Sequence, residues 1–163
     1  MNPSIMSTYA TSFRGKLYAM SVDGPVPLRL SRSNDKWHWG ITPQDDWLMA
    51  GGNGSSMYLD FTFDSHTDDR LHYHITIPGR ERPKKLGKSL NHYLGFYERA
   101  EVNDYWKIEP LQLTDDGLIC HLRDHEGCRT GAIQDTPHRS GQTLYLLNTR
   151  EGDTLTFLLQ QLA

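Results

Sequence analysis

The chain has 163 residues, a length that fits one domain with a core of its own. Its formal net charge of -3 and pI near 6.2 exclude a general attraction to nucleic acid or to an anionic membrane. This charge predicts no nucleic-acid partner, and because the apolar runs are short we expect no membrane insertion.

Residues 1–14 are polar and lack the basic start and the apolar run of about 7–15 residues that a secretory signal needs. We therefore expect a flexible leader there, followed by a single domain over residues 15–163. The expected location is the cytoplasm, or outside the cell after export without a classical signal peptide. Cys120 and Cys128 are too few for a disulfide scaffold, which favours free thiols, with a local disulfide as the alternative.

Alternation of apolar and polar residues predicts short strands in the first half of the chain. Residues 15–22 form the first strand, which ends at the turn Asp23-Gly24-Pro25. Residues 27–30 and 36–41 are predicted to form a hairpin. Residues 57–63 and 71–77 then alternate clearly, which predicts two strands joined by a polar loop.

The second half continues in the same way. Residues 80–88 contain Pro83 and follow Pro78, which predicts a loop, and residues 118–122 form a strand after the turn Asp115-Asp116-Gly117. Residues 129–141 are a polar connection, and residues 143–147 are expected to pair with residues 155–160. Since no segment shows a helical period over ten or more residues, the sequence predicts a nearly all-β domain of roughly a dozen strands.

One motif recurs along the chain. Asn34-Asp35-Lys36-Trp37-His38-Trp39 is followed by Asn103-Asp104-Tyr105-Trp106-Lys107-Ile108 and by a worn third copy, Gly152-Asp153-Thr154-Leu155-Thr156-Phe157. In each copy a polar turn containing Asp leads into alternating large apolar residues. A supersecondary unit repeated three times is therefore expected. The tryptophans Trp37, Trp39 and Trp106 are predicted to lie in the core.

With this repeat, the chain resembles the β-trefoil proteins. The resemblance is carried by Tyr93-Leu94-Gly95-Phe96 with the later Trp106-Lys107-Ile108, and by the parallel pieces from Leu28 to Trp39 and from Leu144 to Phe157. It implies three pseudo-repeated units of about four strands, with six strands in a short barrel and six as capping hairpins. Ricin-type lectins of this fold carry Gln-x-Trp in each unit, where this chain has Asn-Asp-x-Trp twice and Gly-Asp-x-Leu once.

Many β-trefoil proteins are carbohydrate-binding lectins, so the resemblance implies a non-catalytic, lectin-like module without a cofactor. Its expected partner is a glycan or glycoprotein, bound through surface turns, and a homo-oligomer is compatible with the sequence.

The expected ligand-binding residues form two clusters: Asn34, Asp35 and His38, and Tyr97, Asn103, Asp104 and Tyr105. Amides and carboxylates hydrogen-bond sugar hydroxyls while an aromatic ring covers the apolar face of a pyranose. Ordinary turn chemistry is the simpler explanation of Asn-Asp. The departures at Gly152 and Leu155 predict that at most two of the three turns keep ligand contacts.

Two further functions stay open. A protease inhibitor or other protein-interaction trefoil could present Arg80 to Lys88, or Arg129 to Gly141, to a protein partner. A metal-dependent β-barrel enzyme could use His72 and His74, which share one face of a strand, with His66, Asp68 and Asp69 just upstream. For this pair, a solvent-facing polar strand face is the simpler explanation. Cys120 and His121 are adjacent in a predicted strand, so they point to opposite faces and do not form a thiol and base pair.

Overall fold

The computed structural model describes residues 1–31, 46–52, 54–79, 84–97, 105–135 and 144–162. The described chain has one short helix and is otherwise built from strands, so the predicted all-β class is confirmed. The elements are α1 (Pro3–Tyr9), β1 (Phe13–Ser21), β2 (Gly24–Leu30), β3 (Leu48–Gly51), β4 (Tyr58–His66), β5 (Leu71–Thr76), β6 (Lys85–Lys88), β7 (Leu94–Tyr97), β8 (Trp106–Thr114), β9 (Gly117–Arg123), β10 (Gly131–Asp135), β11 (Leu144–Asn148), β12 (Asp153–Thr154) and β13 (Phe157–Gln161). Among the described residues, no helix has the length and apolar character needed to cross a membrane.

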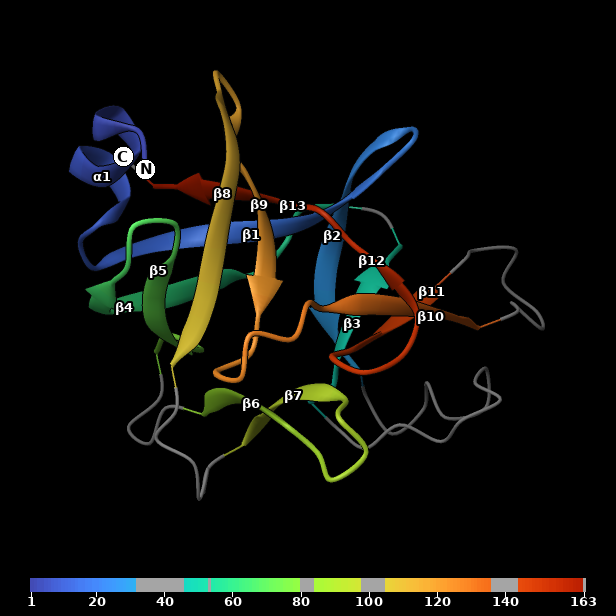
Figure 1. Cartoon of the computed structure of the whole chain (residues 1–163). Coiled ribbons are helices and arrows are strands. Elements are labelled where there is room, and N and C mark those ends of the chain that lie inside the picture. The colour runs from blue at the N-terminus through green and yellow to red at the C-terminus, as the bar shows by residue number, and fades with distance from the viewer. Residues whose placement is uncertain (32–45, 53, 80–83, 98–104, 136–143, 163) are drawn as a thin grey trace.

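The strands belong to one antiparallel sheet, and six of them close on themselves as a ring (Figure 1). The order around the ring is β1, β4, β5, β8, β9, β13 and back to β1. Each ring strand therefore has a hydrogen-bonded neighbour on both sides, which removes the exposed edge that an open sheet presents.

Three hairpins lie between successive pairs of ring strands. They are β2–β3, β6–β7 and β10–β11, and together we call them the hairpin layer. β3 also pairs with β11. Isolated bridges join Trp47 to Gly95 and Tyr93 to Asn148, so all three hairpins are in contact. Figure 1 shows the hairpin layer below and to the right of the ring.

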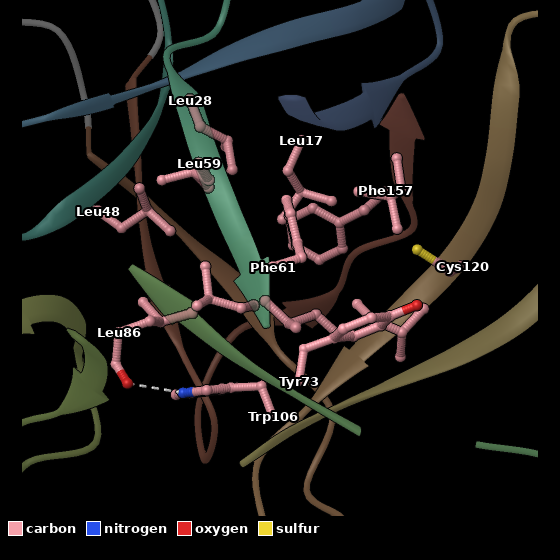
Figure 2. Packing of buried hydrophobic residues seen from close by; sticks show 14 of the residues in the cluster. Leu17, Leu28, Leu48, Leu59, Phe61, Tyr73, Leu86, Trp106, Cys120 and Phe157 are labelled. Carbon is pink, nitrogen blue, oxygen red and sulfur yellow. Dashed lines mark hydrogen bonds between the residues drawn. The ribbon is translucent and has the colours of Figure 1, made fainter. Parts of the chain in front are cut away.

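The main core fills the ring with alternate residues of its strands and extends into the hairpin layer through residues such as Leu28, Leu48 and Leu86. Figure 2 shows Leu17, Phe61 and Phe157 converging from three ring strands, and each is at most 1% exposed. Full burial of side chains of this size stabilises the fold by about 1.5–3 kcal/mol each. Trp106 closes one end of the core, and its indole N–H donates to the carbonyl of Leu86 in β6 at 2.9 Å. This bond joins the ring to the hairpin layer.

The hairpin layer has a smaller cluster of its own. Trp47, Met49, Tyr93 and Leu146 are buried together. The rings of Trp47 and Tyr93 are stacked with their centroids 4.5 Å apart. In addition, Lys88 in β6 donates to the buried carboxylate of Asp124 at 2.7 Å, which fixes the turn after β9 onto the second hairpin.

Several sequence predictions are confirmed. The segments 57–63 and 71–77 form β4 and β5, which pair with each other as antiparallel neighbours. The turn at Asp115-Asp116-Gly117 joins β8 to β9. Trp106 is 4% exposed, as expected of a core residue, whereas Trp37 and Trp39 lie outside the described residues. Cys120 and Cys128 are free.

The prediction of a flexible leader at residues 1–14 is wrong. The segment forms α1, whose N-cap Asn2 accepts a hydrogen bond from the Ser4 amide at 2.7 Å, and it then enters β1. Ile5 and Tyr9, four residues apart on one face of the helix, are buried in the main core. A helix of seven residues offers too few apolar positions for its period to be recognised from sequence.

The predicted pairing of residues 143–147 with residues 155–160 is also wrong, because β11 pairs with β10 and β3. β2 pairs with β3, whereas the expected return strand at 36–41 lies outside the described residues. β7 pairs with β6 and β11 pairs with β10, and Trp106 and Phe157 begin the ring strands β8 and β13. The expected loop at 80–88 contains β6, and the expected polar connection at 129–141 contains β10. Alternation identifies a strand and its buried face, but not the strand with which it pairs.

Candidate functional site

A groove of about 840 Å³ lies where the first hairpin, the third hairpin and β12 meet. We call it the β12 groove. Its volume is within the roughly 300–1,000 Å³ of typical small-molecule sites. Apolar side chains from five segments line it, including Ala19, Val26, Ala50, Ile133 and Leu155. Tyr145, Glu151 and Asp153 supply its aromatic ring and its carboxylates.

The turn that carries the carboxylates is fixed by a buried side chain. Asn148, 1% exposed, accepts hydrogen bonds at its Oδ1 from the amides of Arg150 at 2.7 Å and Glu151 at 3.0 Å. Its side-chain amide donates to the carbonyl of Asn91 at 3.0 Å. Asn148 therefore connects the backbone of the Glu151 turn to the backbone at Asn91.

Gly152 brings this turn against β10. Its φ is +88°, a conformation that favours glycine, and a Cβ there would lie 2.2 Å from the carbonyl oxygen of Ala132. The next residue, Asp153, pairs with Ala132 across the β10–β12 ladder. The close approach that glycine permits thus sets the positions from which Glu151 and Asp153 extend, and both residues are exposed.

The charge of the β12 groove has one sign. Its lining contains Glu151 and Asp153 and no Lys, Arg or His among the described residues. Arg150, the neighbour of Glu151, pairs with Glu126 at 3.5 Å. Carboxylate acceptors beside an aromatic ring and an apolar floor are the combination that binds a sugar, whose hydroxyls donate hydrogen bonds and whose C–H face packs on the ring.

Of the predicted ligand residues, Asn34, Asp35, His38, Asn103 and Asp104 lie outside the described residues.

Tyr97 and Tyr105 are described, and they have different surroundings. Tyr97 lies in β7 within the hairpin layer, where a Cβ on Gly95 would be 3.1 Å from its hydroxyl oxygen and 3.1 Å from the Trp47 ring. Burial raises the pKa of the Tyr97 hydroxyl, and the neighbouring Trp47 indole N–H lowers it by less, although the two groups do not reach the geometry of a hydrogen bond. This tyrosine packs inside the layer.

Tyr105 lies against the outer face of the ring and covers His72. The two rings are stacked with centroids 4.3 Å apart and planes 6° apart. The imidazole is only 4% exposed, so the expectation of a solvent-facing strand position is wrong for His72. Burial lowers the pKa of His72, and the positive charge of Lys107 lowers it further, so the ring is neutral at pH 7.

The hydrogen bonds of His72 determine its tautomer. Ser65 Oγ donates to Asp64 Oδ2 at 2.7 Å and lies 3.0 Å from His72 Nδ1. Because Ser65 has one proton and gives it to the carboxylate, His72 Nδ1 carries the hydrogen of the second bond. Ser65 is therefore not activated as a nucleophile. The part of the chain that the structure describes contains no group of three or more His, Cys, Asp or Glu side chains placed to hold a metal ion.

Two other ionisable side chains, Glu109 and Cys120, have structural surroundings that shift their pKa values. Glu109 in β8 accepts from His121 Nδ1 at 2.9 Å and from Arg123 Nη2 at 2.8 Å, and it pairs with Arg70 at 3.1 Å. Burial alone would raise the pKa of Glu109, but these hydrogen bonds and charges outweigh it and hold the pKa to about 2. Burial raises the pKa of the Cys120 thiol, which makes it a poor nucleophile at pH 7.

Sequence reasoning missed Tyr145, Glu151 and Asp153. A signal for one of them was present, because Asp153 holds the place in the third motif copy that Asp35 and Asp104 hold in the others. The departures at Gly152 and Leu155 nevertheless predict that this copy lacks ligand contacts. The structure shows that Gly152 is the residue this turn requires.

No protein-family model matches the chain, and comparisons with curated proteins and with solved structures give no match either.

Proposed function

We propose that the chain is a β-trefoil built from three units, each made of a ring strand, a hairpin and a second ring strand. The connectivity supports this. The units are β1 to β4 around the hairpin β2–β3, β5 to β8 around β6–β7, and β9 to β13 around β10–β11. Each unit contributes two strands to the closed ring, and the short β12 is an addition to the third.

We further propose that the protein is a non-catalytic, carbohydrate-binding module that holds a glycan in the β12 groove. The observation that carries this proposal is the combination of an apolar floor, the Tyr145 ring and two carboxylates on a fixed turn. A pyranose would pack its C–H face on Tyr145 while its hydroxyls donate to Glu151 and Asp153.

An inhibitor or protein-interaction role is less well supported. Such a protein presents an exposed loop, whereas the described parts of the segments from Arg80 to Lys88 and from Arg129 to Gly141 contain the paired strands β6 and β10.

A glycan array followed by calorimetry with a bound glycan tests the carbohydrate proposal. Tyr145→Ala is expected to weaken binding about tenfold, since the packing of a ring face is worth roughly 1–2 kcal/mol. Tyr58→Ala is the matched control, because Tyr58 is 47% exposed on β4 and does not line the groove. Absence of any bound glycan, or equal affinities for the Tyr145 variant and the unmodified protein, would refute this site.

A further inference from the structure

We propose that the β12 groove selects glycans by charge, binding saccharides that carry a protonated amine, such as glucosamine units, and rejecting sulfated or carboxylated ones. This inference rests on the proposed carbohydrate-binding function and names its ligand class.

The electrostatics of the groove lead to this selection. Glu151 and Asp153 are exposed carboxylates, and within the described residues neither has a hydrogen-bond or ion-pair partner for its side chain. An amine entering the groove therefore meets two free acceptors. A sulfate or carboxylate would meet two like charges with no basic side chain of the described lining to offset them.

The turn geometry favours strong contacts. Asn148 and the β10–β12 pairing hold the backbone of the turn before a ligand arrives, so little backbone ordering is needed on binding. A hydrogen bond from a charged amine to a carboxylate is about twice as strong as one from a neutral hydroxyl. Amine-bearing sugars should for this reason bind more tightly than their neutral counterparts of the same size.

The apolar part of the groove identifies the occupant as a saccharide. Tyr145 lies on β11, paired with Ala50 of β3, and the neighbouring floor is formed by small and aliphatic side chains. This surface suits the flat C–H face of a pyranose ring that extends from the amine. A lysine side chain on a peptide carries the same charge without that face, and it serves as the competing ligand in the test.

Calorimetry with three ligands separates these possibilities: a glucosamine hexamer, its fully N-acetylated form, and a sulfated oligosaccharide of similar length. The glucosamine hexamer is expected to bind at least about tenfold more tightly than the N-acetylated form, with an affinity that falls as salt is added, and the sulfated ligand is expected not to bind. A lysine-containing peptide should bind weakly.

Two double variants assign the preference to the groove. In Glu151→Gln with Asp153→Asn, the preference for the amine should disappear while the N-acetylated hexamer still binds. The matched control, Asp115→Asn with Asp116→Asn, removes the same charge from the exposed β8–β9 turn and should keep the preference.

Each outcome has a distinct meaning. Equal binding of the amine and N-acetylated hexamers, or tighter binding of the sulfated ligand or the peptide, overturns the charge selection. If the N-acetylated hexamer binds and Tyr145→Ala weakens it, the carbohydrate function stands without this selection. If no saccharide of any charge binds, both proposals fail.

Discussion

The closed ring and the hairpin layer differ in how many of their buried polar atoms lack a hydrogen-bond partner. In the part of the chain that the structure describes, six buried side-chain N or O atoms have no hydrogen-bond partner. One of them, His72 Nε2, belongs to a ring strand. The other five lie in or beside the hairpin layer, on Trp47, His92, Tyr97, Thr130 and Thr149.

The two regions also differ in the size of their cores. The large cluster fills the ring and extends into the hairpin layer, where Leu28, Leu48, Leu86 and Phe96 belong to it, while the second cluster of four buried residues packed with Ile133 lies in the hairpin layer alone. An unpaired buried polar atom costs about 1–3 kcal/mol, and most of these atoms lie around the smaller cluster of the hairpin layer. The hairpin layer is therefore expected to open before the ring.

Matched leucines should show the largest difference between the two regions. Leu159 of β13 in the ring and Leu146 of β11 in the hairpin layer are both at most 1% exposed. Leu→Ala leaves a cavity whose cost depends on how far the surroundings relax, with measured values of about 2.7–5.0 kcal/mol. Because Leu159 belongs to the large cluster and Leu146 to the small one, we expect about 4–5 kcal/mol for Leu159→Ala and about 2–3 kcal/mol for Leu146→Ala in urea unfolding. Equal costs would contradict the stated difference in packing.

Acid should weaken the ring through Glu109. The pKa of this carboxyl is about 2 in the folded protein, below its ordinary 4.5, so the unfolded chain takes up the proton first as the pH falls. The resulting stabilisation, about 1–3 kcal/mol, is complete above pH 5 and is lost between about pH 4.5 and 2. Unfolding free energies of the unmodified protein and Glu109→Gln should differ at pH 7 and converge toward pH 2.

An exposed carboxylate provides the control for this pH dependence. The side chain of Glu126 is 50% exposed and makes ion pairs of 3.4–3.7 Å with its neighbours. Such pairs contribute roughly 0–1 kcal/mol, so Glu126→Gln should change little at any pH. A loss as large as that of Glu109→Gln would show that the acid sensitivity is not specific to the ring.

Features of the fold that depend on neighbouring residues could be predicted from the sequence, whereas pairings between strands that are distant in the chain could not. The buried face of β5, with Leu71, Tyr73 and Ile75, follows from alternation within six residues. The pairing of β2 with β3 does not, because residues 31–47 separate the two strands and no local pattern specifies the partner. The same limit applies to the groove. Asp153 could be inferred from the motif repeat. Tyr145 could not, because it reaches the groove only through the pairing of β11 with β3.

Two tyrosines test whether the ring and the hairpin layer differ in their buried polar groups. Their substitutions have the smallest expected effects. The Tyr73 hydroxyl, in the ring, donates to the carbonyl of Tyr9, while the Tyr97 hydroxyl, in the hairpin layer, is buried beside the Trp47 indole without a well-formed hydrogen bond. Tyr73→Phe leaves a buried carbonyl unpaired and should cost about 1–3 kcal/mol. Tyr97→Phe removes an unsatisfied group, so its unfolding free energy should stay unchanged or rise by up to about 1 kcal/mol.

Glycan binding gives the second readout for this pair. Tyr97 does not line the β12 groove, so Tyr97→Phe should bind a glycan held there with unchanged affinity. Reduced binding in a variant of unchanged stability would place Tyr97 in a ligand site, as the sequence predicts. Reduced stability would instead mean that its hydroxyl has a partner in solution, in which case the hairpin layer satisfies its polar groups as well as the ring does, and the expectation that it opens first loses its basis.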